Sequence, residues 1–169
     1  LLAEAGYPNG FDAGDLTPLP PFFTMGEAVG NYLGAVGIRT KLRTMERAAF
    51  FTAAREKKLQ GLILNASGAL GNAATRLETY VLSTGAYAYG GYADIDELFR
   101  QQSAERDRGK REALLHQIQQ LMHERVMHAP IYEPATLHGV GPRVKEPGVG
   151  LNALLYFTSP YEEMRLKRP

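Results

Sequence analysis

The chain has 169 residues, of which 44% are hydrophobic and 22% are charged, proportions that are ordinary for one globular domain. Nineteen Lys and Arg against eighteen Asp and Glu leave a net charge of +1, which excludes a broad basic surface for nucleic acid or an anionic membrane. The absence of cysteine excludes disulfides, thiolate metal sites and a cysteine nucleophile.

The first residues predict the end of a helix. Residues 1–6 have the pattern of a last helical turn, with Gly6 in the position that follows the C-cap. Because the rest of that helix does not precede them, we expect the chain to be part of a longer protein. Residues 7–21 are rich in Pro, Gly and Asp, which predicts a loop with a short strand at 15–19.

The next segment predicts a helix over residues 25–36. Thr24 followed by Glu27 has the pattern of a capping box, apolar residues then recur at helical spacing, and Gly37 ends the helix. One stripe of this helix carries only glycine, each costing about 1 kcal/mol relative to alanine. We therefore expect the helix backbone to pack closely on a sheet along that stripe, which consists of Gly26, Gly30 and Gly34.

Strands and helices then alternate. Residues 38–44 alternate apolar and polar side chains, with Arg39, Lys41 and Arg43 on the solvated face, and predict a half-buried strand. A helix over 47–58 and a short apolar strand over 61–66 follow. This order predicts a layered α/β fold with parallel strands.

The second half of the sequence is mainly helical. An uncharged loop at 65–74 precedes a short helix through Leu77 and Val81, and an aperiodic Gly/Tyr segment follows at 84–92. Asp94 and Asp107 are predicted to cap two further helices, the second of which reaches Val126.

The C-terminal residues predict extended structure. Residues 131–140 contain Pro134, which restricts them to an edge strand or a crossing segment. Residues 143–150 are predicted to form a loop and 151–157 a strand, and the form of 161–167 stays open.

No catalytic or metal site is predicted. His123 and His128 are five residues apart, so on a helix they diverge by about 140° and cannot share one zinc ion. Ser67 lacks the first glycine of a nucleophile elbow, and helix capping and the helix dipole account for Asp94 and Asp96. We expect no cofactor, no metal and no enzymatic activity, with a hydrolase or transferase fragment that uses Ser67 as the alternative.

Four stretches together resemble a known family: residues 1–11 (LLAEAGYPNGF), 33–38 (LGAVGI), 91–98 (GYADIDEL) and 129–132 (APIY). They are similar to the C-terminal lobe of family 5 extracellular solute-binding proteins, the dipeptide, oligopeptide and nickel receptors of bacterial ABC importers. The resemblance implies an α/β, periplasmic-binding-protein-like (type II) lobe with a mixed sheet flanked by helices. Residues 1–140 would be the second lobe, incomplete at its start, and 141–169 would return against a missing N-terminal lobe.

The resemblance also implies partners and a location. A small-molecule solute would be enclosed between two lobes, an ABC permease in the membrane would receive it, and the protein would be periplasmic or otherwise extracytoplasmic. No nucleic-acid partner is implied. A sensor or chaperone-like module that keeps the same lobe without a transporter is a further alternative.

Peptide-binding members of the family usually carry an acidic residue in the loop after the strand that matches 61–66. Here no Asp or Glu occurs between Glu56 and Glu78, so we expect a solute without a free amine at this place. The candidate ligand-binding residues are Asn65, Ser67, Asn72 and Tyr89. Ordinary turn chemistry is the alternative for the three polar residues, and packing on the lobe surface is the alternative for Tyr89.

Overall fold

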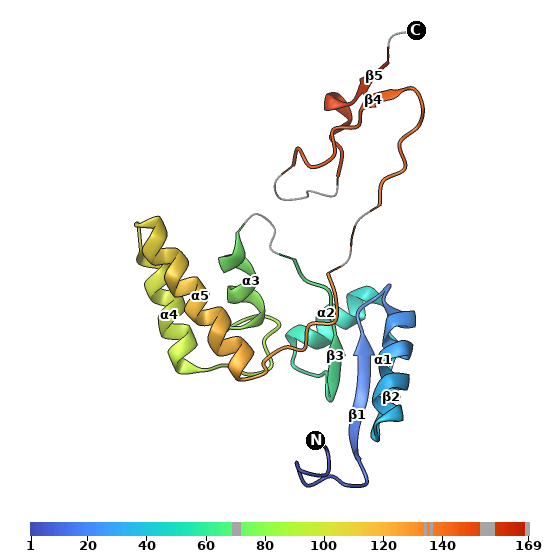
Figure 1. Cartoon of the computed structure of the whole chain (residues 1–169), viewed down its shortest axis with the longest axis vertical. Helices are drawn as coiled ribbons and strands as arrows, with labels where there is room; N and C mark the ends of the chain where they lie inside the picture. The colour runs from blue at the N-terminus through green and yellow to red at the C-terminus, as the bar shows by residue number, and fades with distance from the viewer. Residues whose placement is uncertain (69–71, 134, 136, 153–157, 168–169) are drawn as a thin grey trace. The chain divides into compact units, whose positions relative to one another are not determined.

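The computed structural model describes residues 1–68, 72–133, 135, 137–152 and 158–167. The chain divides into two compact units, Leu1–Ser67 and Gly68–Pro169. Figure 1 shows a small sheet with its helices in the first unit and a group of helices in the second.

The first unit is built on three parallel strands, β1 (Phe11–Pro18), β2 (Ile38–Leu42) and β3 (Leu62–Leu64), in the order β2-β1-β3. Helix α1 (Phe23–Ala35) connects β1 to β2, and α2 (Arg47–Arg55) connects β2 to β3. The two crossovers run in opposite directions, so right-handed connections place the two helices on opposite faces. The predicted parallel α/β arrangement is confirmed.

The central strand β1 is longer than the sequence predicted. Its register shifts between Asp12 and Asp15, and the Asp12 side chain accepts a hydrogen bond of 2.8 Å from the Gly14 amide. Gly14 has a φ of +76°. The Asp and Gly residues that predicted a loop therefore form a bulge within a strand that starts at Phe11.

Helix α1 begins earlier than its predicted cap. Phe22 is the N-cap, no side chain caps the helix, and Thr24 lies inside its first turn, so the predicted capping box is wrong. A turn in which the Phe22 amide donates to the Leu19 carbonyl (2.9 Å) leads directly into the helix.

Two of the three stripe glycines allow the predicted close approach of helix and sheet. A Cβ at Gly26 would lie 2.9 Å from Pro18 Cγ, and one at Gly30 would lie 3.3 Å from Thr40 Oγ1. A Cβ at Gly34 would meet nothing within 4 Å. The close packing is therefore confined to the first two turns of α1.

The core of the first unit contains one polar exception. Thr17 on β1 is 1% exposed, and its hydroxyl has no hydrogen-bond partner among the described residues. The apolar residues of this core are Leu16, Leu19, Phe50, Ala54, Leu59 and Leu64.

The described residues of the second unit form three α-helices, α3 (Ala73–Tyr80), α4 (Ala93–Ala104) and α5 (Arg108–Glu124). Figure 1 shows α4 and α5 lying side by side, and α3 also contacts α4. Their core consists of Leu77, Val81, Leu82, Ile95 and Ile118.

Of the two helix caps predicted in this unit, one is confirmed and the other is wrong. Asp107 caps α5 as predicted, accepting a hydrogen bond of 2.9 Å from the Lys110 amide. Asp94 is not the cap of α4, because Tyr92 occupies that position. Asp94 instead receives two hydrogen bonds, of 2.8 and 2.5 Å, from the guanidinium of Arg125, which also lies 4.3 Å from the centre of the Tyr92 ring. The carboxylate therefore joins the start of α4 to the end of α5.

Helix α5 ends in a left-handed residue. The amide of Met127 donates to the Met122 carbonyl (3.1 Å) and that of Val126 to the His123 carbonyl (3.1 Å), the two bonds of a Schellman motif. Val126 occupies the position that usually holds glycine, with a φ of +49°. The backbone at this helix end is therefore strained.

The C-terminal residues form a small sheet of their own. Strand β4 (Val144–Glu146) pairs antiparallel with β5 (Arg165–Leu166), and a short 3₁₀ helix, η1 (Tyr161–Glu163), precedes β5. The loop predicted over 143–150 is therefore wrong at β4. Most of the strand predicted at 151–157 lies outside the described residues, and Leu151 and Asn152 are irregular. The predicted boundary at 140/141 stays a prediction.

Candidate functional site

The carboxyl ends of β1 and β3 lie next to each other in the first unit. Pro18 is the register partner of Leu64, and the Leu19 amide donates a 2.8 Å hydrogen bond to the Leu64 carbonyl. Ligands of open α/β sheets bind at this edge of the sheet. The strand ends therefore define where a solute site is to be sought.

Asn65 and Ser67 come directly after β3 at this edge. Leu64 is buried, whereas both polar side chains are exposed, so the chain leaves the core within one residue. The hydroxyl and amide groups are the neutral donors and acceptors that orient a small solute. The position of both residues at a strand end agrees with the sequence prediction, and their role in binding stays a prediction.

Asn72 is the N-cap of α3. Its side-chain oxygen accepts a 3.0 Å hydrogen bond from the Ala74 amide, which is the turn chemistry that the sequence left open as an alternative. The side-chain NH₂ group is not used in that bond. The NH₂ group of Asn72 and the second lone pair of its side-chain oxygen remain for a ligand contact.

Tyr89 lies in the segment between α3 and α4 and is 45% exposed. Asn72 and Tyr89 belong to the second unit, whereas Asn65 and Ser67 belong to the first. The grouping of all four residues in one site stays a prediction.

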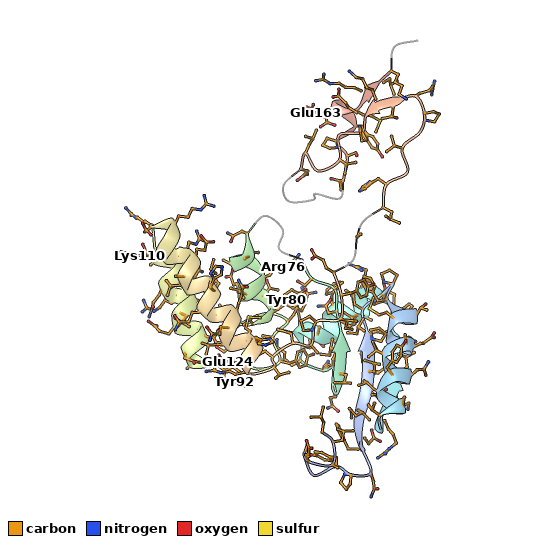
Figure 2. All side chains as sticks on the ribbon, viewed as in Figure 1. Arg76, Tyr80, Tyr92, Lys110, Glu124 and Glu163 are labelled. Atoms are coloured by element: carbon orange, nitrogen blue, oxygen red, sulfur yellow. The ribbon has the colours of Figure 1, made fainter. Side chains whose placement is uncertain are left out.

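Sequence reasoning missed a second set of side chains, which lies on and after α3 and contacts Gly68. The Nε of Arg76 donates a 2.5 Å hydrogen bond to the Gly68 carbonyl, and its guanidinium lies 5.9 Å from the centre of the Tyr80 ring. Tyr80 in turn packs on Tyr87, with ring centres 5.4 Å apart. Figure 2 shows Arg76 and Tyr80 on α3. The available signal was Arg76 itself, the first charged residue after the uncharged stretch 59–75.

The polar side chains after β3 can donate and accept hydrogen bonds to a small molecule. The first unit contains no histidine, so Ser67 has no imidazole base within that unit. Helix α5 ends at Glu124, and His123 and His128 therefore do not share a helix. No group of three or more His, Asp or Glu residues that could hold a metal ion occurs among the described residues.

Comparison with known proteins gives matches to structures alone. No protein-family profile and no curated protein sequence matches the chain. Its structure is similar to OppA of Burkholderia pseudomallei, with a TM-score of 0.73 and 19% identity over 99% of this chain and 33% of that one. It is also similar to NikA of Staphylococcus aureus in complex with Ni(L-His)2, with a TM-score of 0.68 and 13% identity over 98% of this chain and 36% of that one.

A third similar structure is the ABC transporter-associated periplasmic binding protein DppA of Helicobacter pylori, in complex with the peptide STSA. Its TM-score is 0.61, with 19% identity over 75% of this chain and 26% of that one. The chain thus spans about a third or less of the length of these proteins. All are family 5 solute-binding proteins with the type II periplasmic-binding fold, so the fold predicted from the resemblance is confirmed.

Proposed function

We propose that residues 1–140 of this chain form the second lobe of an extracytoplasmic solute-binding protein that serves an ABC importer, and that residues 141–169 return against its first lobe. The observation that carries the proposal is the structural match of 99% of the chain to about a third of OppA. Asn65 and Ser67 support it, because they stand at the carboxyl edge of a parallel sheet, where such folds bind ligands. In the intact protein a first lobe would close over the solute from the opposite side.

The solute that we propose carries no free amine at the loop after β3. Residues 57–77 contain no carboxylate, so the loop after β3 holds no acidic partner for an amine. An ammonium enclosed there would lose its water without gaining a counter-charge, at a cost of several kcal/mol. Asn65, Ser67 and Asn72 would instead hydrogen-bond neutral groups of the solute, and Tyr89 would pack against it.

The proposed partners are a membrane permease and the first lobe of the same protein, and the proposed location is the periplasm or its equivalent. No helix in the described part of the chain is long and apolar enough to cross a membrane. The protein would bind and release its solute unchanged.

A thermal-shift screen of the intact two-lobed protein against peptides, blocked peptides, nickel–histidine complexes and neutral metabolites tests the function. A ligand that binds the native state raises the melting temperature by mass action. We expect at least one solute to do so with one-to-one stoichiometry and without being consumed. Hydrolysis of an ester substrate that is lost in Ser67→Ala would instead establish the enzyme alternative.

A further inference from the structure

Arg76 is a half-buried cation whose guanidinium is hydrogen-bonded to the backbone of Gly68. It is the fourth residue of α3, and its Nε is engaged by the Gly68 carbonyl at 2.5 Å. A guanidinium carries five N–H donors in one plane. The bond to Gly68 uses the Nε–H donor and leaves the four N–H donors of the two Nη groups for other partners. The Nη groups of such an arginine can bind a planar anion through two hydrogen bonds.

The surroundings of Arg76 are aromatic. Tyr80 lies one helical turn further along α3, and its ring lies 5.9 Å from the guanidinium carbon of Arg76. Tyr87 packs on Tyr80 with an interplanar angle of 32°. These three half-buried side chains, which we call the Arg76 ledge, place a positive charge beside flat apolar surface.

The charge of Arg76 is not neutralised locally. Among the residues that the structure describes, no carboxylate forms an ion pair with it, whereas Arg100 and Arg125 each pair with one. The start of a helix carries a partial positive charge, so a cation near this end is disfavoured and an anion is favoured. Both effects attract an anion to the Nη groups of Arg76.

We propose that Arg76 determines solute specificity by binding a carboxylate of the solute, while Tyr80 and Tyr87 pack against its apolar part. The proposal rests on the proposed function and narrows it to solutes that have a carboxylate and no amine at this loop. If Arg76 only held Gly68 against α3, its Nε–H donor would be sufficient for that role. The Nη groups would then have no function. A planar carboxylate fits the remaining donors in a two-point contact.

The test uses the 169-residue chain, labelled with ¹⁵N, and two-dimensional NMR, which detects weak binding to one lobe. The probes are N-acetyl-dialanine with a free carboxylate, the same molecule as the carboxamide, and sodium sulfate at equal ionic strength. The variants are Arg76→Gln and Arg76→Lys. Arg108→Gln is the matched control, because Arg108 is an exposed cation at the first residue of α5.

We expect the carboxylate probe to shift the Arg76 Nε–H signal and to bind about tenfold more tightly than the carboxamide. Arg76→Gln should remove this preference, Arg76→Lys should keep part of it, and Arg108→Gln should keep all of it. Equal binding of both probes, with shifts at Asn65 and Ser67 only, would overturn the role of Arg76 and leave the solute site standing. Equal shifts by sulfate would show a general anion effect and overturn the carboxylate assignment. The absence of any shift would overturn the Arg76 assignment and would also count against the solute site.

Discussion

The backbone of Gly10 lies directly against that of Gly37, so that a Cβ at residue 10 would stand 1.9 Å from the carbonyl oxygen of residue 37. Both glycines have positive φ, and the Phe11 amide donates a 3.0 Å hydrogen bond to the same carbonyl. The contact joins the start of β1 to the turn before β2. Two stretches that carry the family resemblance, 1–11 and 33–38, therefore meet in space.

Gly10→Ala should destabilise the chain by more than about 2 kcal/mol, because the methyl group meets backbone and the φ of +69° is strained for alanine. Gly14→Ala is the matched control: its φ is +76°, but no atom lies within 4 Å of the new Cβ. The control should cost only about 1 kcal/mol. Urea unfolding followed by circular dichroism measures both, and equal losses would contradict the close approach.

Val126→Gly should stabilise the chain by about 1 kcal/mol, since glycine adopts the φ of +49° without strain. Val36→Gly is the control, because Val36 also follows a helix and is exposed but has a φ of −101°. There glycine only adds entropy to the unfolded chain and should destabilise. Melting temperatures that fall in both variants would refute the strain at Val126.

Thr17→Val should stabilise the first unit by about 1 kcal/mol, because a methyl group of similar shape replaces a buried hydroxyl that has no hydrogen-bond partner among the described residues. The control is Thr79→Val, in which the lost hydroxyl donates a 2.8 Å hydrogen bond to the Thr75 carbonyl. That variant should gain nothing or lose stability. A destabilised Thr17→Val protein would show that the hydroxyl has a partner in solution.

Hydrogen bonds from Arg125 lower the pKa of Asp94 below its usual 3.8. A carboxyl group whose pKa is lower in the folded state stabilises the fold above its unfolded pKa, and this contribution is lost as the pH falls through the folded value. In Arg125→Gln, NMR titration should find the Asp94 midpoint restored towards 3.8. Glu97 is the internal control, because hydrogen bonds from Arg100 and Gln101 lower its pKa to about 2. If the titration midpoint of Glu97 shifted together with that of Asp94, the substitution would have changed the helix structure as a whole.

In the intact protein, N-acetylated dipeptides should bind more tightly than the same dipeptides with free amines. An ammonium opposite the uncharged residues after β3 would lose solvation without a counter-charge. Calorimetry with matched pairs of peptides measures the difference. Tight binding of the free-amine forms, abolished by acetylation, would mean that another part of the protein anchors the amine.

Local patterns were sufficient to predict the parallel sheet and the Asp107 cap. The alternation at 38–44 and the cap before α5 each depend on neighbours within one element. The full length of β1 was missed because a side-chain bond from Asp12 turns an apparent loop into a bulge. Asp94 was misassigned because its partner, Arg125, is 31 residues away. Such choices between a cap and a distant ion pair depend on tertiary contacts.

The candidate site likewise has one part that the sequence could predict and one part that it could not. Asn65 and Ser67 could be placed near a strand end because the sequence predicts a strand over 61–66, which in the structure is the shorter β3, Leu62–Leu64. The Arg76 ledge depends on Tyr87, which lies beyond the end of α3 and returns to Tyr80 through a turn. Helical spacing relates Arg76 to Tyr80, but nothing periodic relates Tyr80 to Tyr87.

The order β2-β1-β3 also has a consequence for biosynthesis. The central strand leaves the ribosome first, and both strands that flank it follow, β3 some forty residues after β1 ends. Until Leu62–Leu64 has emerged, one edge of β1 has no backbone partner in this sheet, and Leu16 lacks its register partner Leu62. Parallel pairing across such long connections is intrinsically slow. A nascent chain arrested before residue 62 should therefore be digested readily by protease within β1, whereas one arrested well past residue 64 should resist.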